Sequence, residues 1–282
     1  MKKNWFQLLV FFFFFFQLHA GIVKIDTLNQ VKDELLHADT DSLVIFDVDY
    51  TLIIPRDAIM GPCAKDLRRQ LQKEIIDNPE VTPQGKYAEG HLLSKVLLQS
   101  NASVIDPGSV SLIRELQSKQ IRVIALTAAI GGPFGVLESA ADRRIQELAQ
   151  LEFSFKGAFP QLNTLKFPKD ENKKFHPIFK EGVLFSSQHP KGKVLRQFLE
   201  IAKWRPAKVF FLDDSVDYLQ SVEQAMQEIG IPFSGFHYTA AYTLRCNLDP
   251  EIAALQYRHL AEHGEWLSDL EAKLLLQQNH VK

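Results

Sequence analysis

Two carboxylates that follow a short apolar stretch are the first residues whose spacing points to chemistry. Residues 43–46 (Leu-Val-Ile-Phe) run without alternation into Asp47, and Asp49 and Thr51 follow. An uninterrupted apolar run of this kind is typical of a strand buried on both faces. Open parallel sheets bind ligands at the carboxyl ends of their strands, where Asp47 and Asp49 fall. Two like charges this close require a cation between them or a proton on one of them.

Two further apolar stretches also end in polar residues. The stretch 121–126 is followed by Thr127, and the stretch 208–212 by Asp213 and Asp214. Because the carboxyl ends of parallel strands meet at one edge of a sheet, we expect these side chains to converge with the first two carboxylates. Acidic groups from separate strands make an oxygen-rich site that suits a hard cation such as Mg²⁺. A hydroxyl at the same edge suits a phosphoryl oxygen.

Lys191 stands at the start of a helix predicted over residues 191–203. An ammonium group binds phosphoryl oxygens, and a carboxylate beside a cation can attack phosphorus because the cation offsets the repulsion between two anions. Each residue also has an ordinary explanation: Asp213 and Asp214 as a helix cap, Lys191 as a solvated surface side chain. Their conjunction at the ends of three buried strands favours one site.

The rest of the chain alternates between apolar strands and amphipathic helices, which predicts an α/β doubly wound sheet. Residues 152–179, rich in Phe, Lys and Pro, predict a hairpin or an irregular excursion. Between about residues 60 and 100, scattered Leu and Ile in a polar background predict two helices. The other expected elements are strands at 182–186 and 233–238, and helices near 27–36, 109–116, 136–148, 216–229 and 250–278.

The N-terminus predicts export. Lys2 and Lys3 precede an apolar run from Leu8 to Phe16, so residues 1–20 have the layout of a signal peptide, with an uncleaved membrane anchor as the alternative. No later stretch is apolar enough to predict stable membrane insertion. The net charge of −2 with mixed signs implies no general affinity for nucleic acid. The only cysteines, Cys63 and Cys246, are either paired or two free thiols.

Four segments resemble, in chain order, the four motifs of the haloacid dehalogenase (HAD) superfamily. Residues 47–51 (Asp-Val-Asp-Tyr-Thr) are similar to D-x-D-x-T, and residues 125–127 to an apolar strand that ends in Ser or Thr. Residues 191–195 resemble K-G-x-x-L, and residues 210–214 an acidic strand end. The match spans about residues 42–221. With its leader, the chain resembles secreted HAD-like bacterial proteins and, more loosely, the secreted acid phosphatases of the superfamily.

The resemblance implies a Rossmann-like parallel sheet, with residues 21–59 and 101–282 as the HAD-like core and residues 60–100 as a helical cap inserted after the first strand. It implies a Mg²⁺-dependent phosphohydrolase, periplasmic or secreted, that acts on a small phosphate monoester through an aspartyl-phosphate. The alternatives are a HAD phosphotransferase, or an inactive binding or host-interaction protein on the same scaffold.

The resemblance also implies roles for individual residues. Asp47 would be the nucleophile and Asp49 the acid and base, while Thr127 and Lys191 would hold the phosphoryl group, with Lys193 as the rival of Lys191. Mg²⁺ would be held by the Asp47 carboxylate, the Asp49 backbone carbonyl, and either Asp213 or Asp214. Arg56 and Asp57 fall where the family has a mobile flap, either as substrate contacts or as a solvated turn.

Overall fold

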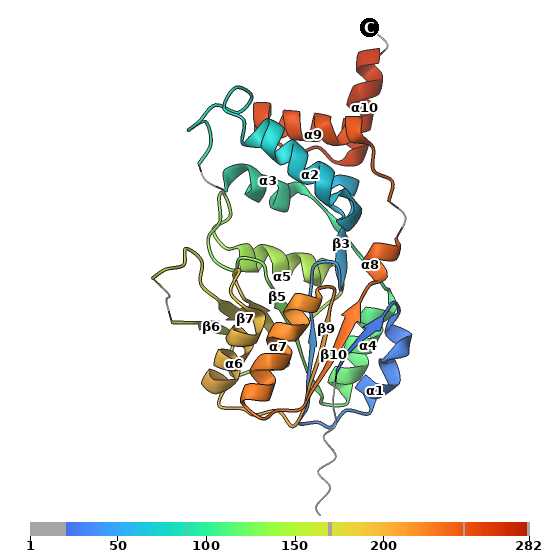
Figure 1. Cartoon of the computed structure of the whole chain (residues 1–282), viewed down its shortest axis with the longest axis vertical. Coiled ribbons are helices and arrows are strands. Elements are labelled where there is room, and N and C mark those ends of the chain that lie inside the picture. The colour runs from blue at the N-terminus through green and yellow to red at the C-terminus, as the bar shows by residue number, and fades with distance from the viewer. Residues whose placement is uncertain (1–20, 89, 169–170, 245, 281–282) are drawn as a thin grey trace, which may run out of the picture.

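The computed structural model describes residues 21–88, 90–168, 171–244 and 246–280. The predicted signal peptide, residues 1–20, lies outside the described residues. In the described ranges, no helix combines the length and the apolar character needed to cross a bilayer. The described part consists of an α/β layer and a separate group of helices beside it (Figure 1).

One large sheet forms the centre of the α/β layer. In the described part of the chain it has eight strands in the order β1-β10-β9-β2-β5-β8-β7-β6. Neighbours from β1 to β8 pair in parallel, whereas β7 and β6 extend the edge antiparallel. The prediction of a parallel α/β sheet is therefore confirmed in coarse form, as a mostly parallel sheet with an antiparallel edge. The strands are β1 (Ile22–Ile25), β2 (Leu43–Phe46), β5 (Arg122–Thr127), β6 (Thr164–Lys166), β7 (Ile178–Lys180), β8 (Val183–Phe185), β9 (Val209–Asp213) and β10 (Phe233–Tyr238).

Helices cover both faces of the sheet, because the central strands send alternate side chains to opposite sides. In β2, Val44 and Phe46 belong to one apolar cluster, and Leu43 and Ile45 to another. The run predicted to be a strand buried on both faces is confirmed as such. The first cluster includes side chains of α1 (Lys32–Leu36), α4 (Gly108–Ser118) and α5 (Ala140–Gln150), and the second includes those of α6 (Lys191–Ala202) and α7 (Val216–Glu228).

The second group of helices has an apolar cluster of its own. Leu71 and Leu92, from the segment predicted to be helical between residues 60 and 100, pack in the same cluster as Tyr257 and Leu260 from the C-terminal part of the chain. The sequence-based division assigned that C-terminal part to the core, whereas its helix α9 lies in the helical group. The helices of the group are α2 (Lys65–Leu71), the π-helical segment η4 (Gln72–Ile76), α3 (His91–Gln99), α9 (Pro250–His263) and α10 (Asp269–His280).

Two connections join the α/β layer to the helical group. The antiparallel pair β3 (Ile53–Pro55) and β4 (Ala102–Val104) leads into α2 and back from α3. The second connection follows β10 and contains α8 (Ala240–Thr243). Cys246 of this connection forms a disulfide with Cys63, with the two Cα atoms 6.2 Å apart. Of the two alternatives that the sequence left open for the cysteines, the structure contains the pair.

Asp57 fastens the C-terminal helices to the first connection. Its carboxylate is buried, and it accepts hydrogen bonds from Trp266 Nε1 (2.8 Å) and the backbone N–H of Asp269 (3.1 Å). The Asp269 carboxylate in turn accepts one from the Ala58 N–H (2.9 Å). Asp57 is therefore buried and hydrogen-bonded within the protein, and does not belong to a solvated turn. Arg56 is exposed and donates to Ser103 Oγ over 2.9 Å.

The other differences from the predicted elements are local. Strand β1 was not predicted, because four residues beside the leader carry little signal until they pair with β10. The helix expected from residue 136 starts at Ala140, since the Ser139 hydroxyl accepts a hydrogen bond from the Asp142 N–H (3.2 Å) and so caps α5. Residues 152–179 contribute β6 and most of β7 to the sheet edge, as an antiparallel pair. Within the described ranges, the 3₁₀ segments are η1 (Leu28–Gln30), η2 (Ala58–Met60) and η3 (Pro62–Ala64).

Candidate functional site

Strand β2 places Asp47 at the carboxyl edge of the sheet. The Asp47 N–H donates to the Leu212 carbonyl of β9 (2.9 Å), so the backbone of Asp47 continues the pairing of β2 with β9. The Asp47 side chain is buried. The chain then turns sharply through Tyr50, whose φ of 64° is in the left-handed region. Beyond the turn, the hydroxyl of Thr51 is buried with no hydrogen-bond partner within the described part of the chain.

Lys191 lies between two of the strand-end carboxylates. Its Nζ donates to Asp47 Oδ1 over 2.5 Å and to Asp213 Oδ2 over 2.7 Å, and its side chain is fully buried. The Asp213 carboxylate also accepts a hydrogen bond from the Ser215 N–H (2.8 Å), which begins the approach to α7. Asp47 at the end of β2, Asp213 at the end of β9 and Lys191 at the start of α6 were predicted to converge, and they meet in one buried contact.

Gly192 explains why Lys191 can reach this position. A Cβ atom on Gly192 would lie 1.9 Å from the Ser221 carbonyl oxygen, so only glycine lets α6 approach α7 this closely. The Gly192 N–H donates to Ser221 Oγ (3.1 Å). Lys193, the rival candidate, is exposed on the other side of the helix start, and Lys191 is the lysine that lies at the carboxylates.

Burial and the neighbouring charges shift the titration of this contact. Burial raises the pKa of Asp47 well above its usual range; Lys191 opposes the shift, and Asp213 and Asp214 add to it. Burial alone would lower the pKa of Lys191, but the two carboxylates that it contacts outweigh burial and raise it. The negative charge of the ionised carboxylates is thus larger than the positive charge of the single Lys191 ammonium group. A further cation would therefore be attracted to the cluster.

Asp214 completes an acidic cluster. One carboxylate oxygen from each of Asp47, Asp213 and Asp214 lies within 4.8 Å of the others. The Tyr242 hydroxyl of α8 donates to Asp214 Oδ2 over 2.6 Å, and burial raises the pKa of Asp214 to about 6 although this hydrogen bond opposes the rise. Three carboxylates and the Lys191 ammonium carry a formal net charge of −2 when all are ionised. Such a donor set and charge fit a divalent cation.

Asp49 belongs to a different set of contacts. Its Oδ1 accepts from Arg144 Nη2 of α5 over 2.8 Å, and its Oδ2 lies 3.5 Å from the hydroxyl of Thr127. Arg144 Nη1 also contacts Glu147 Oε2 at 2.7 Å. Burial alone would lower the pKa of Arg144, but the carboxylates of Asp49 and Glu147 outweigh it and raise the pKa. Asp49 and Thr127 are thus neighbours, as predicted, and the Asp49 carboxylate stands outside the three-carboxylate cluster.

Sequence reasoning missed Arg144 and Tyr242. The only signal for Arg144 is its place on the helix after Thr127, with Glu147 three residues further on, which is an ordinary helix-surface spacing. Tyr242 reaches Asp214 from a connection whose path follows from the disulfide and from the packing of α9. Neither position could be found from local pattern, because both contacts join segments about 28 or more residues apart.

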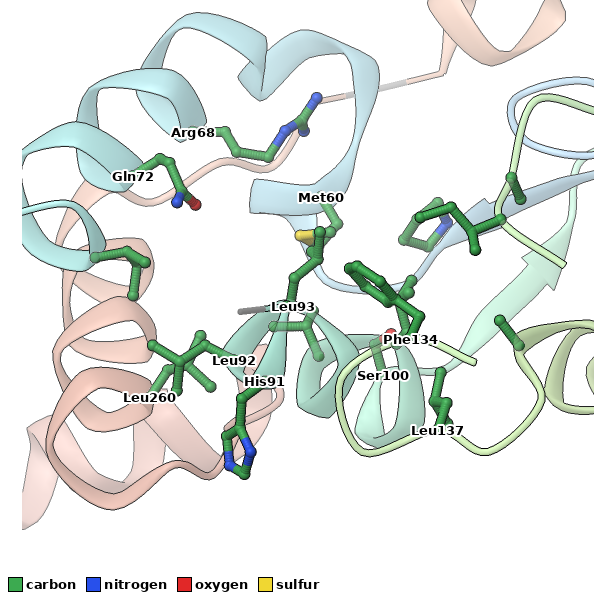
Figure 2. A pocket seen from close by; sticks show the side chains of 18 of the residues that line it. Met60, Arg68, Gln72, His91, Leu92, Leu93, Ser100, Phe134, Leu137 and Leu260 are labelled. Atoms are coloured by element: carbon green, nitrogen blue, oxygen red, sulfur yellow. The ribbon is translucent and has the colours of Figure 1, made fainter. Parts of the chain in front are cut away.

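A cavity of about 1340 Å³ opens between the edge of the sheet and the helical group. Asp49 and Arg144 line it on the sheet side, whereas Asp47 and Lys191 do not. Figure 2 shows the side chains of Met60, Leu93 and Phe134 around this space. The cavity therefore has charged side chains at the strand tips and on α2, and most of the exposed surface of its walls is apolar.

Comparison with known proteins places the chain among bacterial relatives. It is 22% identical over 252 residues to the Rickettsia prowazekii protein "Uncharacterized protein RP296", which covers 88% of each chain. It is 23% identical over 260 residues to a Chlamydia trachomatis protein named "Putative outer membrane protein", covering 92% of this chain and 91% of the relative. A Chlamydia pneumoniae protein with a similar name is 25% identical over 282 residues, 98% of each chain.

The family match extends over nearly all the described residues. Residues 24–273 match the family described as "Protein of unknown function (DUF2608)". This range contains the acidic cluster, Lys191, the Asp49–Arg144 pair and both connections to the helical group. This chain is a member of the DUF2608 family.

Proposed function

We propose that this chain is a HAD-type phosphohydrolase that depends on Mg²⁺ and cleaves a phosphate monoester through Asp47. The buried contact of Lys191 with Asp47 and Asp213 carries the proposal. A surface or capping role would leave these groups in water, whereas burial of three charged groups at strand ends is costly without a function or a compensating ion. A mostly parallel sheet whose second strand leads into a helical group also suits the HAD-like core and cap.

Mg²⁺ is assigned to the carboxylates of Asp47, Asp213 and Asp214. Their oxygens lie within 4.8 Å of one another, and their negative charge exceeds that of Lys191. Carboxylate oxygens are the donors that Mg²⁺ prefers, and it binds through one or two of them together with water and substrate phosphate. When bound, the ion would neutralise part of the charge on the phosphoryl oxygens. Both Asp213 and Asp214 are proposed as metal ligands, and Asp213 also accepts the hydrogen bond from Lys191.

In the proposed reaction, an Asp47 carboxylate oxygen attacks phosphorus and forms an acyl-phosphate bond as the ester P–O bond breaks. Asp49 gives a proton to the leaving alcohol oxygen. It then takes a proton from water, whose oxygen attacks phosphorus and releases inorganic phosphate and the free Asp47 carboxylate. Lys191 and Thr127 donate hydrogen bonds to the phosphoryl oxygens. No atom or charge is left over, because the sum is hydrolysis of the ester by water.

Arg144 orients the proton carrier in this scheme. Its guanidinium holds Asp49 Oδ1, so that Oδ2, on the side of Thr127, is the oxygen that exchanges the proton. Glu147 fixes Arg144 from the other side at 2.7 Å. Asp49 also lines the cavity, which gives a leaving alcohol room beside its carboxylate.

The proposed place of action is outside the cytoplasm, in the periplasm or beyond. The sequence of residues 1–20 supports export, and so do the names of the chlamydial relatives as outer membrane proteins. Export to a compartment with little nucleoside triphosphate favours hydrolysis over phosphotransfer. The disulfide also suits an oxidising compartment.

The test is hydrolysis of a generic aryl phosphate with Mg²⁺ and with a chelator, comparing the wild type with Asp47→Asn. We expect turnover that requires Mg²⁺ and is lost in Asp47→Asn. Asp39→Asn is the matched control, since Asp39 is exposed in the loop before β2, and it should retain full activity. Absence of turnover on this substrate and on a broad panel of phosphate esters would favour the inactive binding scaffold. Unchanged activity of Asp47→Asn would refute the nucleophile.

A further inference from the structure

The size of the cavity exceeds what a small phosphate monoester needs. It measures about 1340 Å³, and small-molecule sites commonly measure roughly 300–1,000 Å³. A phosphate group at the Asp49–Arg144 end would occupy a minor part of this space. The remainder must therefore hold the alcohol part of a large substrate, or solvent.

The walls of the cavity favour an apolar occupant. Four apolar side chains of α3 line the cavity: Leu92, Leu93, Val96 and Leu97. Leu92 and Val96 also belong to the apolar cluster of the helical group. Leu93 leaves 51% of its surface exposed. Met60 and Phe134 line the same space and are half-buried. Apolar surface left open to solvent around one hollow is typical of a ligand-binding site.

The arginine side chains of the walls already contact other groups of the protein, and Lys65 is a further cationic residue of the lining. Arg143 and Arg144 both contact Glu147, at 3.4 and 2.7 Å. Arg68 Nη1 donates to the carbonyl oxygens of Ile59 and Gly61, both at 2.9 Å. These contacts favour an occupant with one anionic group at the Asp49 end over one with several phosphates along the cavity.

We propose that the ligand of this cavity is amphiphilic: a phosphate monoester whose alcohol is a long alkyl chain or an extended apolar ring system. The phosphate lies at the strand ends, and the apolar part extends between α3, Met60 and Phe134. The identity of the site as a phosphate site rests on the proposed function, and the apolar preference rests on the cavity walls.

Binding of alkylphosphonates tests this proposal, because these probes carry the headgroup and the chain but no hydrolysable ester. Calorimetry of ethyl-, butyl-, hexyl- and octylphosphonate, each below its micelle concentration and with Mg²⁺ present, should give a Kd that falls about three- to fourfold with each added methylene. A Kd that does not depend on chain length would overturn the proposal, whether or not the protein hydrolyses phosphate esters.

A matched pair of variants on α3 shows where the alkyl chain of the probe binds. Leu93→Gln should make the Kd of octylphosphonate rise at least about tenfold and flatten the dependence on chain length. Leu98→Gln is the control: Leu98 is 46% exposed on the same helix but does not line the cavity, and this variant should bind as the wild type does. If the two variants changed the Kd equally, the alkyl chain would bind outside the cavity, and this would contradict the proposal.

The result is independent of the test of hydrolysis. If the protein hydrolysed the aryl phosphate but the Kd of the alkylphosphonates did not depend on chain length, the phosphohydrolase would be supported and the amphiphilic substrate refuted. If that Kd fell steeply with chain length but no ester was hydrolysed, the amphiphilic ligand would be supported and the hydrolysis refuted.

Discussion

Arg144 Nη2 of helix α5 lies 2.8 Å from Asp49 Oδ1, at the turn after strand β2. The pair connects the residue proposed to carry protons with a helix that follows the neighbouring strand of the sheet. The Arg144 side chain is 14% exposed and that of Asp49 is 37% exposed, so water screens the pair only in part, and the orientation of the Asp49 carboxylate depends on Arg144.

We therefore expect Arg144→Ala to lower kcat for the aryl phosphate by about tenfold or more, because a general acid or base that loses its orientation loses part of its contribution of roughly 10²–10⁴. Arg114→Ala is the control, since Arg114 forms an exposed ion pair with Glu152 at the same distance, 2.8 Å. Steady-state kinetics separate kcat from KM. A fall in both variants alike would show that the loss of Arg144 acts on folding in general.

Lys191 should also be essential for stability. Lys191→Met leaves Asp47 and Asp213 buried without their cation, and removal of one partner from a buried pair costs about 3–5 kcal/mol. Lys193→Met removes an exposed ammonium from the same helical turn and should change the free energy of unfolding by less than about 0.5 kcal/mol. Urea unfolding measures both values. Similar stabilities of the two variants would argue against the buried contact.

The metal-free protein should become less stable as the pH rises through the titration of Asp214. Its pKa is raised from 3.8 to about 6 by burial, so between these values the native state binds more protons than the unfolded state. Stability contributed by the protonated carboxyl is present below pH 3.8 and is lost as the pH rises to about 6. Thermal unfolding in chelator across this window should show the decline, and Asp214→Asn should reduce it.

Addition of Mg²⁺ should reverse this trend. A cation binds ionised carboxylates, so the rise in Tm that Mg²⁺ causes should be larger above the pKa of about 6 than below it. Asp214→Asn should weaken the effect of the ion, while Asp39→Asn should leave it unchanged. An effect of Mg²⁺ that is equal at both pH values, or is absent from the wild type, would count against the metal site.

The disulfide should contribute strongly to stability. Cys63 and Cys246 are 183 residues apart, and a cross-link that closes so long a loop destabilises the unfolded chain by about 5 kcal/mol in the chain-entropy treatment. Dithiothreitol should therefore lower the Tm of the wild type. A Cys63→Ser/Cys246→Ser variant should already have the lower Tm and should not respond to the reductant. Free thiols in the unreduced, unfolded wild type would show that the bond does not form.

The sequence determined the strand that presents Asp47 and the strand that presents Asp213, because a long apolar run specifies burial on both faces wherever it occurs. It also determined the start of α6. The choice between Lys191 and Lys193 required the packed structure, since two residues along a helix lie on different sides, and the side facing the carboxylates depends on how closely Gly192 approaches Ser221.

Tertiary structure alone decided the partners of the site and the shape of its cavity. Arg144 and Tyr242 reach Asp49 and Asp214 from segments with no pattern of their own. Helix α9 packs with α2 and α3 although about 150 to 180 residues separate it from them in the chain. Local sequence specifies which residues form a strand or helix, through propensity and periodicity. Contacts between distant segments depend on how whole elements pack, and no single segment of the sequence contains that information.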